Sequence, residues 1–164
     1  MSLPPAESAK SSKRTDQEVL EKFATAKSRP HCSQTLSLEV IGVEQAQGRV
    51  RVAMVGKDEW CNPRGALQGG FVTAMLDEAM AVAGIVGGDM AFGVPTLELK
   101  VTFLRPCPAG PVEAEGRVVR WGKSAVFLEA DLFDKDGHHV ARASSTVLPI
   151  PLPTRATSGP RREG

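Results

Sequence analysis

The sequence is poor in the residues that nucleic-acid-binding proteins depend on. It contains no tyrosine, and aromatic residues make up only 5% of its 164 positions. Exposed aromatic rings are the usual platform for single-stranded bases, so we expect no such platform here. The net charge of +1 also lacks the basic excess that neutralises phosphates. We therefore expect no nucleic-acid partner.

Cysteine is scarce as well. The three cysteines are odd in number and widely separated: Cys32, Cys61 and Cys107. They form no CxxC pair, and with the three histidines they show no metal-ligand spacing. We interpret them as unpaired thiols of a reducing compartment and predict a cytoplasmic protein without a metal site.

The sequence predicts neither a secretory signal nor a membrane-spanning segment. The first twenty residues contain no apolar run that could serve as a signal core. Residues 71–86 approach the length and hydropathy of a membrane span, but Asp77 and Glu78 at the centre would be costly in lipid. We predict that this segment is a buried helix of a protein with no membrane partner.

The composition along the chain predicts one domain between two tails. Residues 1–14 are rich in serine, proline and lysine, and residues 151–164 are proline-rich and then basic, so both are expected to be flexible. Residues 15–150 carry regular hydrophobic patterns and form the single predicted domain. A helix is expected over 16–27 and a second after Gln68, ending at Gly87 and Gly88. Period-two alternation predicts strands over 35–44, 48–55, 96–103, 112–121, 124–133 and 139–148.

The second helix sets the architecture. Because it is apolar on nearly every side, it must be covered on every side. An antiparallel sheet wrapped around it would cover one side, and a second subunit is expected on the other. In the strand over 96–103, alternation places Leu97, Leu99, Val101 and Phe103 on one face and Thr96 on the other.

The start of this helix combines features of an anion site. Gln68, Gly69 and Gly70 leave backbone N–H groups free and unshielded, and such amides can hold an oxyanion. Asp77 lies two turns later, roughly 10 Å away by helix rise, which is too far to act on a group held there by the same chain. Two antiparallel helices from neighbouring subunits would bring the amides and the carboxylate together. The alternative is structural, with glycines that allow close packing and an Asp77 that bonds to Thr73 or a backbone group.

The stretch "NPRGALQGGFVTAMLDEA" resembles the acyl-CoA thioesterases of the hotdog fold, in the branch of the phenylacetate-pathway and 4-hydroxybenzoyl-CoA thioesterases. The family pattern is matched at five positions: Asn62, Gly65, Gly69, Gly70 and Asp77. The resemblance covers roughly residues 35–148. It implies an α+β hotdog fold, a homodimer or homotetramer, and hydrolysis of an acyl- or aryl-CoA thioester to a free acid and coenzyme A. No cofactor is implied beyond the coenzyme A of the substrate.

The resemblance also implies roles for individual residues. The Gly69 amide would polarise the thioester carbonyl, with help from Asn62, and Asp77 of the facing subunit would act as general base or nucleophile. Thr96 would help to place the attacking water.

Further residues are implied or expected to contact the substrate. Coenzyme A would meet the turn of Gly122, Lys123 and Ser124, and Arg105 would meet its phosphates, although solvated surface charge is an alternative for Lys123 and Arg105. Gly70 and Glu78 border the expected site, and Phe71 and Met75 are expected to form an apolar acyl wall.

One departure from the family pattern concerns catalysis. Gln68 stands where the family usually has histidine, and a glutamine forms hydrogen bonds but carries no proton near pH 7. Catalysis would be slower if this position must supply a proton, whereas a glutamine would serve if the position only orients the loop. The departure leaves open a non-catalytic acyl-CoA or acyl-carrier binding protein of the same fold. A hotdog dehydratase is a third reading, disfavoured because no histidine lies in this stretch.

Overall fold

The computed structural model describes residues 14–26 and 29–153. Its helices are α1 (Asp16–Ala24), α2 (His31–Thr35) and α3 (Gly69–Gly87), with short 3-10 turns at Gln45–Gln47 and Asp58–Trp60. Its strands are β1 (Glu39–Glu44), β2 (Arg49–Gly56), β3 (Phe92–Gly93), β4 (Thr96–Phe103), β5 (Gly110–Trp121), β6 (Val126–Asp134), β7 (His139–Val147) and β8 (Ile150–Pro151).

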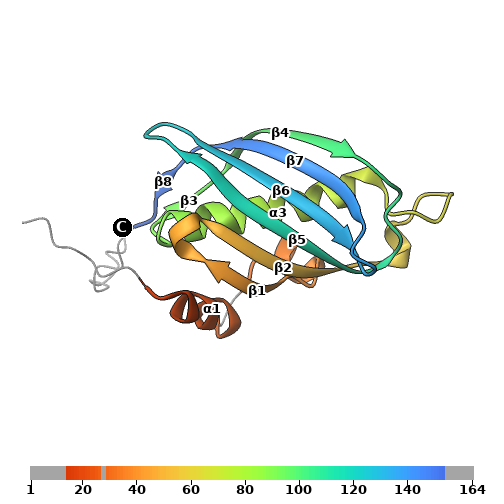
Figure 1. The fold of residues 1–164 in the computed structure, drawn as a ribbon, viewed down its shortest axis with the longest axis horizontal. Coiled ribbons are helices and arrows are strands. Elements are labelled where there is room, and N and C mark those ends of the chain that lie inside the picture. The colour runs from red at the N-terminus through yellow and green to blue at the C-terminus, as the bar shows by residue number, and fades with distance from the viewer. Residues whose placement is uncertain (1–13, 27–28, 154–164) are drawn as a thin grey trace, which may run out of the picture.

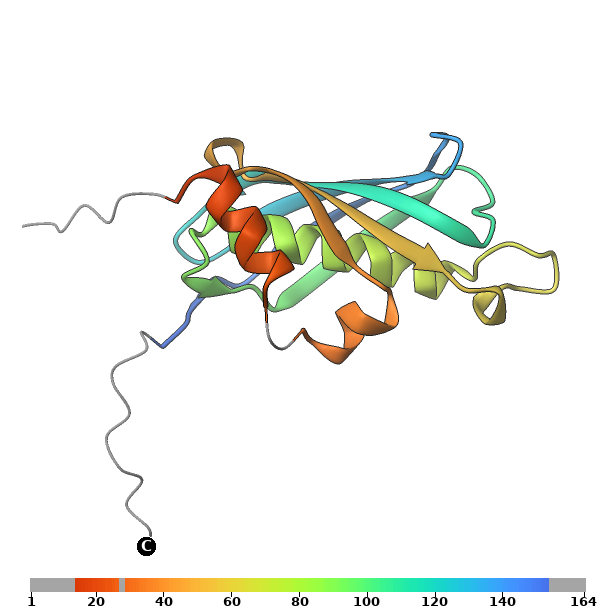
Figure 2. The same ribbon diagram turned by 90° about the horizontal axis from the view of Figure 1, so that it is seen from below.

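Within the described residues, six strands form one antiparallel sheet in the order β1-β2-β5-β6-β7-β4. The sheet curves around α3, while α1 and α2 lie beside α3 near the β1 edge (Figures 1 and 2). β3 and β8 form a separate two-stranded pair. The predicted α+β hotdog architecture, a curved antiparallel sheet around one long helix, is confirmed.

The helix α3 is the centre of the core. Met75, Leu76, Ala79, Ala83 and Val86 have no exposed surface. The helix is long and apolar enough to cross a membrane by length and composition, yet half of its most apolar stretch is buried inside this domain. Its hydropathy is therefore that of a core helix against a sheet, as predicted.

The helix and the sheet approach each other most closely at Gly116 of β5. A Cβ added there would overlap the backbone carbonyl of Ala79 and lie 3.3 Å from the Ala83 side chain. Only a residue without a side chain allows this distance between backbone layers.

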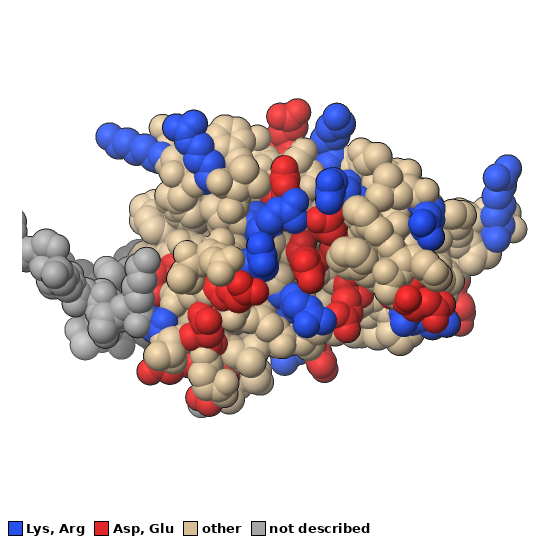
Figure 3. Space-filling model, viewed as in Figure 1, with Lys and Arg blue, Asp and Glu red and all other residues tan. Residues whose placement is uncertain are grey.

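The outer face of the sheet carries interleaved charges rather than a patch of one sign (Figure 3). Asp131 lies at its centre, where its carboxylate accepts hydrogen bonds from Arg142 at 2.6 Å and Arg117 at 2.9 Å. Burial alone would raise the pKa of Asp131, but the two guanidinium groups outweigh burial and hold the pKa below its usual value. A satisfied network of this kind covers the sheet without needing a ligand.

The strand β4 differs from its predicted alternation. Its pairing with β7 shifts register between Thr96 and Glu98, which places Leu97 in a bulge. The buried Ser145 hydroxyl donates to the Glu98 carbonyl at 2.9 Å beside this bulge. Thr96 consequently faces α3, on the same side as Leu99 and Val101, instead of the opposite side. A bulge re-aims neighbouring side chains in this way.

The N-terminal segment confirms one prediction and corrects another. The helix expected over 16–27 is present as α1, which starts with a capping box of Thr15 and Glu18 and ends at Ala24 rather than at residue 27. The predicted strand over 35–44 is wrong in its first half, because α2 occupies 31–35 and β1 starts at Glu39. Ser37 between them adopts a positive φ of 53°, which a strand cannot contain. Leu36 and Leu38 are buried as their alternation suggested, but from a loop.

The predicted tails lie mostly outside the described residues. Of the expected C-terminal tail, 151–153 are described, and Pro151 belongs to β8, where it pairs with Phe92 of β3. The domain boundaries remain predictions.

We expect Gly116→Ala to lower the free energy of unfolding by about 1–3 kcal/mol, because the new methyl group forces α3 away from the sheet. Urea denaturation followed by circular dichroism measures the change. Gly42→Ala is the matched control, since a Cβ in β1 would meet Arg51 at an ordinary 3.5 Å. Equal stability of the two variants would contradict this account of helix–sheet packing.

Candidate functional site

Asp77 and Thr96 form the polar contact at the middle of α3. The Thr96 hydroxyl donates to the Asp77 carboxylate at 2.9 Å. The β4 bulge makes this contact possible because it turns Thr96 toward the helix. Asp77 thus lies on the side of α3 that faces the edge strand β4, to which Thr96 belongs.

The start of α3 shows what Gln68 does. Its side-chain Oε1 accepts a hydrogen bond from the Gly70 amide at 2.6 Å, so Gln68 is the N-cap of the helix. A Cβ at residue 70 would lie 2.8 Å from that oxygen, so a larger residue there would require the capping side chain of Gln68 to shift. The described residues offer no partner to the Gly69 amide. Of the two glycine amides, Gly69 therefore holds the free donor.

The loop before α3 shapes a cavity at the helix start. The Asn62 side-chain oxygen accepts from the amides of Arg64 at 2.9 Å and Ala66 at 3.4 Å, which folds the loop into a turn. Asn62, Gly69 and Arg105 all line a cavity of about 540 Å³, as does Arg64, which the sequence analysis did not single out. The ring of Phe103 covers Gly69 from β4, since a Cβ there would lie 3.1 Å from its tip.

Two of the expected acyl-wall residues pack into the domain instead. Phe71 stacks on Trp60 with ring centroids 4.7 Å apart, and Met75 is completely buried. Within one chain, both therefore contribute core packing rather than a free wall.

Glu78 points away from Asp77, toward α2. Its carboxylate accepts a hydrogen bond at 2.9 Å from the hydroxyl of Ser33, a residue that is only 8% exposed. Adjacent helical residues point about 100° apart, so the two carboxylates serve different surroundings. Sequence patterns gave no signal for Ser33, because α2 has only five residues and no apolar period.

The turn of Gly122, Lys123 and Ser124 lies at the other end of the sheet. It connects β5 to β6 beyond Trp121, whose ring packs on Phe92 after the end of α3 (Figure 1). The Gly69 end of α3 is about 27 Å away by helix rise. One chain alone therefore does not bring this turn to the cavity at Asn62 and Arg105.

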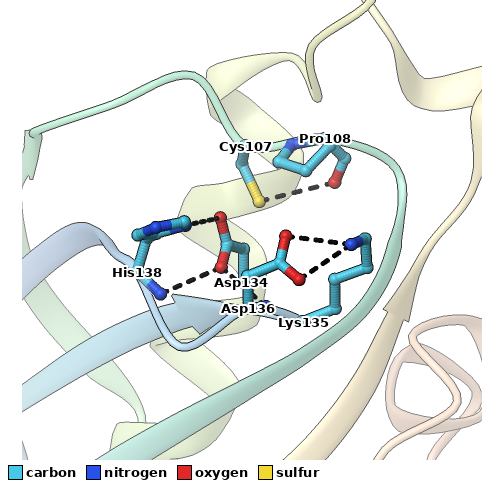
Figure 4. Close-up of polar contacts among 6 residues, drawn as sticks. All are labelled: Cys107, Pro108, Asp134, Lys135, Asp136 and His138. Atoms are coloured by element: carbon cyan, nitrogen blue, oxygen red, sulfur yellow. Dashed lines mark hydrogen bonds and ion pairs between the residues drawn. The ribbon is translucent and has the colours of Figure 1, made fainter.

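The hairpin between β6 and β7 gathers Asp134, Asp136 and His138, whose ligand atoms lie within 4.8 Å of one another. Figure 4 shows that these groups already have partners. Asp134 accepts from the amides of Asp136 at 3.0 Å and His138 at 2.9 Å, and Asp136 pairs with Lys135 at 2.9 Å. These contacts account for the group as a hydrogen-bonded turn.

Comparison with known proteins agrees with this geometry. The model of the thioesterase superfamily matches residues 64–141. A Saccharolobus solfataricus protein named as a candidate esterase is 34% identical over 108 residues, which cover 66% of this chain and 75% of the relative. The chain belongs to the thioesterase superfamily. The family resemblance that the sequence carried is thereby confirmed.

Solved structures share this fold over most of the chain. A Ralstonia eutropha protein described as a candidate thioesterase related to phenylacetic acid degradation is 28% identical, with a TM-score of 0.73 over 79% of this chain and 98% of that one. The Escherichia coli PaaI protein of the phenylacetic acid degradation operon is 20% identical, with a TM-score of 0.72 over 83% of this chain and 96% of that one. A Streptococcus mutans protein bound to acetyl-CoA is 21% identical, with a TM-score of 0.62 over 70% of this chain and 89% of that one. The last two are similar in fold.

The thiol of Cys107 borders the cavity and gives a test of local packing. It is 3% exposed, and burial together with the nearby Asp134 carboxylate raises its pKa to about 11 (Figure 4). Only roughly one thiol in a thousand would then be ionised at pH 8, where thiolate is the reactive form. We expect a thiol reagent to label the exposed Cys32 in the native protein long before Cys107. Peptide mapping of the labelled sites in wild type and Cys32→Ser measures this order, and fast labelling of Cys107 would contradict the packing.

Proposed function

We propose that this thioesterase-superfamily chain hydrolyses an acyl- or aryl-CoA thioester to a free acid and coenzyme A. The observation that carries the proposal is that one helix has two features. Its Asp77 carboxylate accepts a hydrogen bond from the Thr96 hydroxyl, and its first turn leaves the Gly69 amide free. The superfamily membership and the esterase-named relative support a thioester hydrolase in general. A Streptococcus mutans protein of similar fold binds acetyl-CoA, which supports a CoA ester as substrate.

The free amide of Gly69 would stabilise the oxygen of the thioester carbonyl as negative charge develops on it. The side-chain N–H₂ group of Asn62, in the same cavity, can add a second donor. Gln68 acts here as a helix cap, so its lack of a titratable proton does not prevent this arrangement. The structural role of that position favours catalysis over the non-catalytic binding protein.

Asp77 would activate water or attack the carbonyl carbon itself, with Thr96 orienting its carboxylate. In the general-base route, water adds to the carbonyl carbon while Asp77 accepts its proton. The carbon–sulfur bond then breaks, and the proton passes to the departing thiolate. The nucleophilic route reaches the same acid and thiol through a mixed anhydride that water opens.

The two halves of the proposed site come from different subunits. Gly69 and Asp77 are eight residues apart, which is about 12 Å along α3. The edge strand β4 supports a dimer, because it exposes 62% of Leu97 and 54% of Phe103 beside its unpaired backbone edge. Two chains related by a twofold axis through this edge would place their α3 helices antiparallel. The remote turn of Lys123 would then also approach the partner's cavity.

Coenzyme A would lie across the cavity at the helix start. Arg64 and Arg105 line it and can pair with the phosphates of the nucleotide end. The turn of Lys123 and Ser124, brought by the partner, would add further polar contacts. No cofactor beyond the substrate's own coenzyme A enters the scheme.

We expect Asp77→Asn to lower kcat at least about a hundredfold, because it removes the group that accepts the proton or attacks. Free-thiol release from acetyl-, medium-chain and aryl-CoA measures it.

We expect Gly69→Pro to lower kcat about a hundredfold or more in the same assay, because it removes the amide donor. Proline suits the first helical position, and the extended φ and ψ of Gln68, −64° and 139°, suit the residue before it.

Gly69→Ala is the matched control for Gly69→Pro, since it keeps the amide and adds only a Cβ that the half-exposed Phe103 can accommodate. Turnover by Gly69→Ala with loss in Gly69→Pro supports the amide's role. Binding of CoA thioesters without any turnover by wild type would instead favour the non-catalytic binding protein.

A further inference from the structure

A second cavity, of about 620 Å³, lies between α3 and the N-terminal helices. Its walls come from the last turn of α1, from Ala26, Arg29 and Pro30 before α2, from the start of β1 and from one side of α3. This volume is within the range of cavities that enclose small organic ligands. None of the residues assigned to the acyl-CoA site above lines it except Glu78.

The helix α3 contributes a continuous row to this cavity. Glu78, Ala81, Val82 and Ile85 follow one another at the i, i+3, i+4, i+7 spacing of a single helix face. The row begins beside Asp77 and runs toward the C-terminal end of the helix, where Met90 closes it. The Glu78 side chain itself points toward α2 rather than toward Asp77, but Ala81, which also lines the cavity, lies one helical turn after Asp77.

The lining changes character along this row. Close to Asp77 it is polar, with the Glu78 carboxylate held by the Ser33 hydroxyl at 2.9 Å. The charged residues Lys22, Arg29 and Glu39 also line the cavity. Farther along the α3 row, the wall is apolar and is formed by Phe23 of α1 together with Ile85 and Met90. These three side chains pack on the core but remain partly exposed. An amphiphilic ligand with its polar end near Asp77 and an apolar tail would bury them.

We propose that this cavity holds a linear acyl chain of the substrate, with its thioester end near Asp77 and its methyl end at Ile85 and Met90. The proposal rests on the thioesterase function of the previous subsection. Glu78 and Ile85 are seven residues apart, so the apolar wall extends about 10 Å along the helix. A wall of this length suits a medium-length chain, whereas an acetyl group would not reach it.

The substrate preference should therefore depend on the size of side chains along the row. We expect Ile85→Phe to lower kcat/KM for octanoyl-CoA at least tenfold and to leave acetyl-CoA unchanged, because the new ring fills the far end of the cavity. Each methylene that the cavity buries should favour binding about fourfold, so the loss should grow with chain length. Phe23→Ala enlarges the same end from α1 and should shift the preference toward longer chains.

The control is Val119→Phe, which adds the same bulk at an exposed position on the outer face of the sheet. Thermal unfolding of all variants verifies that they are folded, and Phe23→Ala tests the cavity if Ile85→Phe does not fold. An unchanged chain-length profile in both cavity variants would overturn the proposal.

Binding of an octyl-CoA thioether, measured by calorimetry, separates this inference from the catalytic one. If no thioester is hydrolysed but the thioether binds more tightly than its butyl counterpart, and Ile85→Phe abolishes the difference, the cavity holds acyl chains and the hydrolase is wrong. If thioesters are hydrolysed but neither turnover nor binding responds to Ile85→Phe or Phe23→Ala, the hydrolase stands and the acyl cavity is wrong. If free octanoic acid binds in the cavity without competing with octanoyl-CoA, the cavity is a separate fatty-acid site and the proposal is wrong.

Discussion

The burial of α3 against the concave face of the sheet is the constraint on which the rest of the structure depends. The helix meets β5 at Gly116 so closely that no side chain fits between the two backbones. One side of the helix is thereby committed to the core, and the other side is left for polar groups. Asp77 and Glu78 occupy that second side, where Thr96 and Ser33 bond to them. The charge at the centre of an apolar helix is thus tolerated because it lies at the limit of the core.

The same constraint separates the parts of the proposed catalytic site. A straight helix keeps the free Gly69 amide and the Asp77 carboxylate two turns apart, and nothing within one chain can shorten that distance. The edge strand β4 presents apolar side chains and unpaired backbone groups beside Asp77. A second copy of the chain would cover this edge and supply the missing half of each site. In the proposed mechanism, catalysis therefore requires dimerisation.

The sequence predicted the elements whose pattern is strong. The long apolar run of α3 and the alternation over β5 to β7 each had one dominant period, and the structure follows them. The sequence predictions failed where local backbone geometry overrides the hydrophobic alternation. The bulge at Leu97 turned Thr96 to the face opposite to its expected one, and the αL conformation of Ser37 ended the predicted first strand early.

The candidate site was predictable only in part for a related reason. Gly69, Asn62 and Asp77 were identified by a spacing that the family shares, and the structure places Asn62 and Gly69 at one cavity. The contact of Glu78 with Ser33 joins residues 45 positions apart through a five-residue helix, and no sequence period encodes it. The role of Gln68 as helix cap also depends on a side-chain rotamer, which composition and spacing do not specify.

The most direct test of a site shared between subunits is complementation between two inactive variants. Asp77→Asn and Gly69→Pro would be unfolded together, refolded as an equal mixture and assayed for thioester hydrolysis. If each site combines Gly69 of one subunit with Asp77 of the other, a mixed dimer holds one intact site, and random pairing restores about a quarter of wild-type activity. If each chain carries a complete site of its own, every site in the mixture keeps one defect. Activity no higher than that of the separate variants, with mixed dimers present, would contradict the account.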